Sequence, residues 1–153
     1  MTYNVDKVIP ISDINPARNT PVISRIFMIS TVLIYILIQP KNQIELINFF
    51  YQYSAIPCEL VNFAPLSESQ FYNNNCFYDQ LNVIFPNKNL YLSIIYANFL
   101  HANFLHILGN LWSFWIFGNN VEDQLGKVNY FLFLLLIGTI SIFSHTYQNQ
   151  ESL

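Results

Sequence analysis

Two histidines and an asparagine, His101, His106 and Asn110, lie in a stretch that is otherwise apolar enough to enter a lipid bilayer. Polar groups at that depth are costly and usually face a bundle interior or a wet cavity, so they mark candidate functional sites. His106 and Asn110 are four residues apart, which puts both on one face of a helix. His101 comes five residues before His106, on another face or in the lead-in turn. The structural alternative is hydrogen bonding between membrane helices by the same groups.

Two other chemistries fit these residues less well. A zinc site would need His101, His106 and His145, but only two of these are close in sequence and there is no His-Glu-x-x-His pattern. Ser113 shares the helix face of His106 one heptad later and could be a nucleophile. No general base is visibly placed for it, and serine commonly packs between membrane helices. We therefore predict no metal and no cofactor.

The composition indicates a membrane protein. Of the 153 residues, 53% are hydrophobic and only 10% are charged. A soluble domain carries about 25% charged residues, so this chain cannot cover a water-facing surface in the usual way. The net charge of −3 argues against nucleic acid as a partner, because that role requires a basic surface. The predicted surroundings are a lipid bilayer.

Apolar runs and proline breaks divide the chain into an all-α membrane protein with three transmembrane helices. We predict an extramembrane lead over residues 1–20, a membrane domain over 21–146 and a polar tail over 147–153. Within the membrane domain the predicted helices are about 22–39, 104–120 and 128–145, and residues 41–100 form a long, partly embedded loop at the membrane surface. Glu122 and Gly126 are predicted to cap and turn the connection between the last two spans.

Basic residues set the expected orientation. Lys7, Arg18 and Arg25 fall in the first 25 residues, whereas the long loop carries only Lys41 and Lys88. The positive-inside bias therefore favours a cytoplasmic N-terminus and an external loop. An external loop permits a disulfide between its two cysteines, at positions 58 and 76, although we favour two free thiols.

Three segments of the sequence resemble the N-terminal half of a bacterial rhomboid-family intramembrane serine protease. Residues 9–16 resemble the family's entry to its first helix, and residues 55–60 resemble the stretch after that helix. The most specific run extends from Phe99 through the two histidines and Asn110 to the Val-Glu-Asp-x-x-Gly turn that ends at Gly126. It is similar to the family's second helix and following turn almost position by position, and the resemblance covers essentially the whole chain.

The resemblance implies a fold and a set of roles. The family's fold is a six-helix bundle in which a serine in a Gly-x-Ser-Gly context attacks the peptide carbonyl and a histidine on the sixth helix is its base. The second helix supplies a histidine and an asparagine to the oxyanion hole, and these roles fall on His106 and Asn110. His101 corresponds to a further histidine of the family and is a candidate substrate contact; the alternative is an interfacial histidine that holds the loop. An imidazole and an amide one helical turn apart can both donate to one carbonyl oxygen.

The chain departs from the family pattern in a way that bears on activity. No Gly-x-Ser-Gly occurs in it, and no fourth to sixth span follows. We therefore interpret it as a rhomboid-type protease of the bacterial inner membrane, truncated before its nucleophile and base and inactive alone. Its expected partner is a transmembrane-helix substrate or client, together with any protein that supplies the missing helices. The alternative is a non-catalytic rhomboid-like protein that binds client helices.

Overall fold

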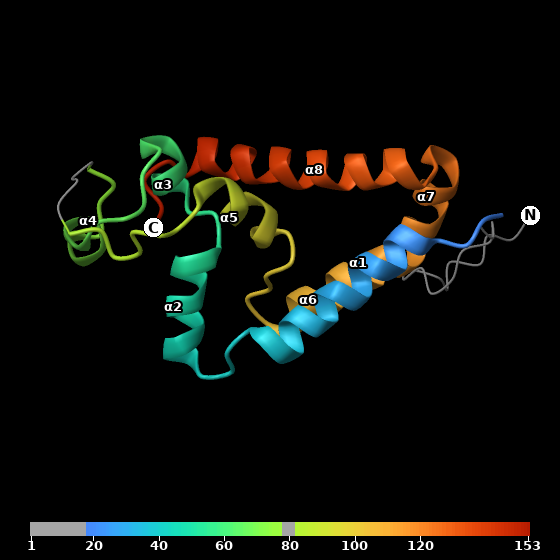
Figure 1. Cartoon of the computed structure of the whole chain (residues 1–153), viewed down its shortest axis with the longest axis horizontal. Helices are drawn as coiled ribbons and strands as arrows, with labels where there is room; N and C mark the ends of the chain where they lie inside the picture. The colour runs from blue at the N-terminus through green and yellow to red at the C-terminus, as the bar shows by residue number, and fades with distance from the viewer. Residues whose placement is uncertain (1–17, 78–81) are drawn as a thin grey trace, which may run out of the picture. The chain divides into compact units, whose positions relative to one another are not determined.

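The computed structural model describes residues 18–77 and 82–153, and over these residues the chain is helical with no strand. One isolated antiparallel bridge joins Ser67 and Val83. The expected all-α class is confirmed. The elements are α1 (Val22–Leu33), η1 (Ile34–Ile38), α2 (Gln43–Tyr53), α3 (Pro57–Asn62), α4 (Glu68–Asn73), α5 (Leu90–Ala97), α6 (Phe104–Ser113), η2 (Phe114–Gly118), α7 (Asn119–Leu125) and α8 (Lys127–Gln148); η1 and η2 are π-helical turns (Figure 1).

Each predicted span corresponds to helical structure. Residues 22–38 are helical through α1 and η1, residues 104–125 through α6, η2 and α7, and residues 127–148 through α8. By length and composition, α8 is the one described helix that could cross a membrane, and Val22–Ile38 is a shorter apolar helix. Only 6% of the most apolar window of α8 is buried within the protein, as a lipid-facing helix requires. The count of three spans remains a prediction.

The long loop is more ordered than its sequence suggested, because it contains α2, α3, α4 and α5. Polar side chains cap the N-terminal ends of three of these helices. Asn42 accepts hydrogen bonds from the first turn of α2, Asn89 does so for α5, and Ser67 and Gln70 form a reciprocal capping box on α4. Such caps satisfy N–H groups that a helix cannot bond internally, so short helices form where apolar runs are too short to span.

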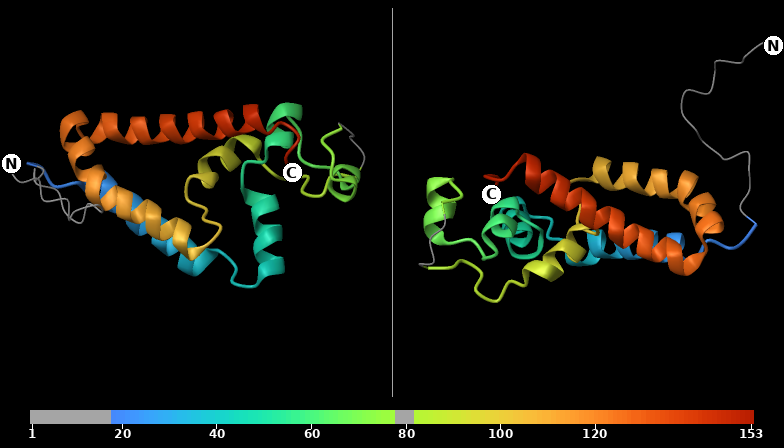
Figure 2. Two further views of the ribbon diagram at one scale, coloured as in Figure 1. Left: turned by 180° about the vertical axis from the view of Figure 1, so that it is seen from behind. Right: turned by 90° about the horizontal axis from the view of Figure 1, so that it is seen from above.

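The described chain divides into two compact units. Unit 1 comprises Met1–Leu33 and His101–Phe133, of which residues 1–17, including most of the predicted lead, lie outside the described residues. In it α1 and α6 lie side by side, as both views of Figure 2 show. The rings of Phe27 and Phe114 stack at 4.9 Å. A Cβ on Gly118 would lie 3.1 Å from both Ser24 Oγ and Tyr130 Oη, so glycine permits this close approach.

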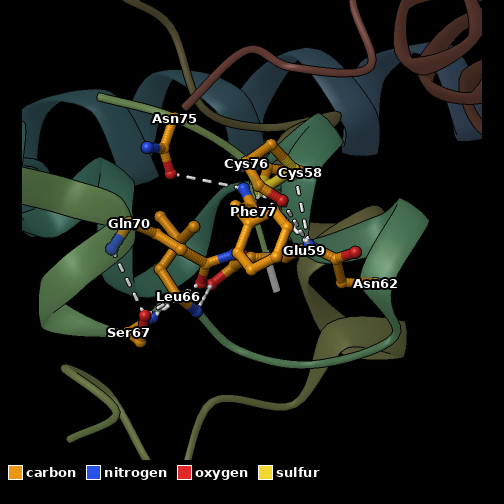
Figure 3. The surroundings of a disulfide bond; sticks show 9 residues. All are labelled: Cys58, Glu59, Asn62, Leu66, Ser67, Gln70, Asn75, Cys76 and Phe77. Carbon is orange, nitrogen blue, oxygen red and sulfur yellow. Dashed lines mark hydrogen bonds between the residues drawn. A yellow bond between two sulfur atoms is a disulfide. The ribbon is translucent and has the colours of Figure 1, made fainter. Parts of the chain in front are cut away.

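Unit 2 comprises Ile34–Leu100 and Leu134–Leu153 and contains a disulfide core. Cys58 and Cys76 are bonded, with their Cα atoms 5.5 Å apart, so the favoured prediction of two free thiols is wrong. Cys58 is fully buried beside Ile56 and Leu66. The side-chain amide of Asn62 donates to the Cys76 carbonyl at 3.2 Å, as Figure 3 illustrates. The pairing depends on how α3 packs against the segment after α4, a contact that the spacing of the cysteines does not reveal.

Candidate functional site

The three candidate residues come together at the start of α6. His101 lies in the segment before the helix and is buried, with 3% of its surface exposed. Its Nε2 is 2.8 Å from Asn110 Nδ2, and its ring centroid is 5.1 Å from that of His106 in an edge-to-face arrangement. Asn103 fixes the helix start by accepting a hydrogen bond from His106 N at 2.9 Å. His106 and Asn110 themselves are exposed on α6.

This arrangement adds His101 to the pair that the helix spacing predicts. The prediction left His101 on another face or in the lead-in turn, and the structure places it in the lead-in segment. From there it contacts both members of the pair. Because an amide nitrogen can only donate, the His101–Asn110 bond requires a neutral His101 with its Nε2 unprotonated. The second N–H of the Asn110 amide is not needed for this bond.

The two alternative chemistries receive no support from the described residues. The Ser113 hydroxyl donates to the Gly109 carbonyl of its own helix at 3.0 Å, which is ordinary behaviour for a helical serine. Across residues 18–77 and 82–153, no group of three or more His, Cys, Asp or Glu side chains could hold a metal ion.

A second polar cluster in unit 1 was not anticipated. The Glu122 carboxylate accepts hydrogen bonds from Ile23 N at 2.9 Å, Ser24 N at 2.8 Å and Ser24 Oγ at 2.8 Å. Asp123 likewise accepts from the backbone N–H groups of Arg18 and Asn19 and from the Asn19 side chain. Glu122 therefore caps the N-terminal end of α1, where a negative charge also meets the helix dipole favourably, and Asp123 holds the segment just before that helix.

This finding corrects the role expected of Glu122. Its side chain caps a helix about a hundred residues away in sequence, whereas the turn that follows α7 is made by Gly126, with φ 75° and an N–H bonded to the Glu122 carbonyl. Burial raises the pKa of the Glu122 carboxyl, but the donors on Ser24 and Ile23 together lower that pKa below its ordinary value. Glu122 is thus held as a carboxylate although only 3% of it is exposed.

Unit 2 holds its own buried charges. Lys88 forms an ion pair with Glu59, and both side chains are 1% exposed. Glu59 also accepts from Leu66 N at 3.1 Å, and Lys88 donates to the Tyr51 carbonyl at 2.7 Å. Burial raises the pKa of Glu59, an effect that Lys88 partly offsets, and burial lowers the pKa of Lys88. The pair joins α2, α3 and the start of α5 but presents no reactive group to solvent.

Comparison with known protein families gives one match, in the C-terminal part of the chain. Residues 88–152 match the family model of the Rhomboid domain, and this region contains the whole histidine–asparagine cluster. The matched region is similar to the Rhomboid domain, which supports the resemblance to the rhomboid family in its most specific part. Residues 9–16 and 55–60 lie outside the match. No curated protein and no solved structure gives a significant match. The family is membrane-integral and includes intramembrane proteases, which act on transmembrane substrates, and their relatives.

Proposed function

We propose that this chain is the oxyanion-stabilising part of a rhomboid-type intramembrane serine protease. One observation carries the proposal: in the family-matched region, the imidazoles of His101 and His106 and the amide of Asn110 converge at the start of one helix. The predicted roles of His106 and Asn110 as donors to a substrate carbonyl oxygen fit this geometry. Fixed donors of this kind stabilise the charge that develops on the carbonyl oxygen during acyl transfer.

His101 has a defined part in this proposal. By accepting one N–H of the Asn110 amide at 2.8 Å, it fixes the plane of that amide and leaves the second N–H for the carbonyl oxygen. His106 supplies an imidazole N–H from the neighbouring turn. In this proposal His101 is a positioning residue rather than the substrate contact that the sequence resemblance suggested.

Hydrolysis also requires a nucleophile and a base. The proposal assigns the serine and its histidine to polypeptide other than these 153 residues, which contain no Gly-x-Ser-Gly. That polypeptide is either a continuation of the same gene or a partner membrane protein. Sequencing the gene beyond codon 153 separates the two possibilities. A continuation would encode Gly-x-Ser-Gly in an apolar helix. A stop codon followed by unrelated sequence would assign the serine and the histidine to a partner protein.

A cleavage assay tests the donor roles. Reconstituted with a model transmembrane substrate, the 153-residue chain alone should give no cleavage, whereas the complete enzyme should cleave. In the complete enzyme, His106→Ala and Asn110→Ala should each lower kcat by about 10²–10³, the usual effect of losing one oxyanion donor. Ser113→Ala, on the same helix, is the matched control and should leave kcat unchanged. Equal kcat values for Asn110→Ala and the control would refute the assignment.

A second candidate function is a non-catalytic rhomboid relative that holds client helices. The observation that favours it is the presence of the donor cluster without the family's serine motif. Photocrosslinking of the 153-residue chain to a model transmembrane helix would support this function if binding is retained in Asn110→Ala, because binding without chemistry does not depend on an oxyanion donor.

We also propose the bacterial inner membrane as the location, with a cytoplasmic N-terminus. The Cys58–Cys76 disulfide supports an external position for the loop, since disulfides persist in oxidising compartments. Labelling of engineered cysteines in intact cells tests this orientation. A cysteine at Asn87 should react with a membrane-impermeant maleimide, and a cysteine at Asn19 should not.

A further inference from the structure

A shallow apolar groove runs along one face of unit 1, between α1 and α6. Its volume is about 470 Å³. The residues that line it are Met28, Ile29, Val32 and Leu33 from α1 and Leu108, Leu111, Trp112 and Trp115 from α6 and η2. No polar side chain belongs to this lining, and its members remain open, with Ile29 59% and Trp115 69% exposed.

Contacts along the two helices fix the ends of the groove. Ser24 bonds to Glu122, and Phe27 stacks on Phe114, so α1 and the α6–α7 run are antiparallel. Trp115 therefore lies at the end of the groove nearest the start of α1. The opposite end lies near Leu33 and Leu108. From position 25 to position 33 an α-helix rises about 12 Å, which is less than half the roughly 30 Å of a bilayer's hydrocarbon core.

Arg25 stands at the Trp115 end on the same helix face. Relative to Arg25, the α1 residues of the groove are at i+3, i+4, i+7 and i+8, which is the repeat of one helical face. A helical side chain leans toward the N-terminus, so Arg25 extends beyond the groove rather than into it. It is exposed, and among the described residues no carboxylate forms an ion pair with it. The nearby Glu122 carboxylate is occupied by the start of α1.

We infer that this groove is a binding site for an anionic phospholipid, with one acyl chain along the groove and the phosphate at Arg25. Such a lipid matches the site from one end to the other. Its acyl chain fits an apolar channel one leaflet deep, its interfacial region lies beside the indole of Trp115, and its phosphate meets the cation at the end of the helix. An acyl chain is flexible and thin enough for a shallow channel. A transmembrane helix would need a groove that continues through the whole bilayer.

The chain's only two tryptophans, Trp112 and Trp115, both line the groove, so intrinsic fluorescence reports on its occupant. The experiment reconstitutes the full chain in phosphatidylcholine vesicles. A small fraction of the lipid is replaced by phosphatidylglycerol or phosphatidylcholine with brominated acyl chains, and tryptophan quenching is measured. Brominated phosphatidylglycerol should associate about fivefold more strongly than brominated phosphatidylcholine, the factor for one basic residue at an anionic membrane surface.

Two variants decide the source of that preference. Arg25→Gln should reduce the fivefold preference to about one while leaving the chain folded by circular dichroism. Lys127→Gln removes a comparable interfacial cation at the start of α8 and should keep the preference. Equal quenching by both lipids in the wild-type chain would overturn the inference. Tryptophans shielded from both lipids would also overturn it, because a helix or a second copy of the chain would then occupy the groove.

Discussion

The two units of this protein stabilise their buried carboxylates in different ways. In unit 1 the buried carboxylate of Glu122 is matched by backbone N–H groups, so no second side-chain charge is needed. In unit 2 the buried carboxylate of Glu59 is matched by the ammonium of Lys88, and a disulfide closes the same core. A helix N-terminus stabilises an anion where it already stands, whereas an ion pair must desolvate two charges. Unit 1 is therefore expected to lose less stability than unit 2 when its buried carboxylate is neutralised.

The largest effect should come from Glu59→Gln. This change leaves the Lys88 ammonium buried without its counter-charge, and losing one partner of a buried pair typically costs about 3–5 kcal/mol. The measurement is local opening of α2–α5, followed by hydrogen exchange in nanodiscs. Replacing both residues by apolar ones (Glu59→Leu with Lys88→Met) should restore most of the loss. If the single and double variants exchange alike, the ion pair does not hold the unit together.

The disulfide should contribute slightly less. Cys58→Ser with Cys76→Ser releases a loop whose ends are 18 residues apart, and a closed loop of that size constrains the unfolded chain by about 3 kcal/mol. Hydrogen exchange should accelerate in α3 and α4 and stay unchanged in α1 and α6. An equal acceleration in α1 would show that the two units open together.

Glu122→Gln should weaken unit 1 by about 2 kcal/mol, since hydrogen bonds to a charged group are worth roughly 1.5–3 kcal/mol. The expected signature is faster exchange at Ile23 and Ser24. Glu122→Asp, which keeps the charge on a shorter side chain, is the matched control and should lose less stability than Glu122→Gln. Identical exchange in the Gln and Asp variants would mean that reach, rather than charge, limits the cap.

Acid should weaken the cap that Glu122 places on α1. The folded pKa of Glu122 lies below its ordinary value of 4.5, so its contribution is complete above pH 4.5 and is lost as the pH falls through the folded pKa. Hydrogen exchange measured as a function of pH should show α1 loosening as the pH falls below 4.5.

The smallest predicted difference concerns two glycines. A Cβ on Gly109 would have no atom within 4 Å, so Gly109→Ala should stabilise α6 by about 1 kcal/mol. A Cβ on Gly138 would lie 1.8 Å from Asn98 Oδ1, and moving that side chain would break its hydrogen bond to the Ile94 carbonyl. Gly138→Ala should therefore give no net gain. Thermal unfolding of the two variants in detergent checks the contrast, and a gain at Gly138 would contradict it.

The sequence predicted those parts of the fold that depend on local pattern. Apolar runs located α8 within a few residues, and the spacing of His106 and Asn110 placed both on α6. The short loop helices were missed although Asn42 and the Ser67–Gln70 capping box are visible in the sequence. A capping pattern is informative only when the segment that follows it is itself predicted to be a helix.

The remaining features depend on contacts between distant parts of the chain. The Glu122 cap joins two residues that are 98 positions apart in the sequence, and no local pattern predicts it. The bond from His101 to Asn110 depends on the conformation of the segment before α6, which helix periodicity does not describe. The cysteine pairing likewise follows from the packing of α3. Tertiary packing, rather than residue type, decides each of these.

The π-helical turn η2 lies between α6, which carries His106 and Asn110, and α7, which carries Glu122. A π turn closes its hydrogen bonds over one residue more than an α turn, so the helix emerges from it with a shifted phase. Asn110 and Glu122 can therefore point in directions that a uniform α-helix of the same length would not allow. One continuous helix thus presents Asn110 in one direction and the Glu122 cap in another, and a single-residue deletion inside η2 would bring the two back into one phase.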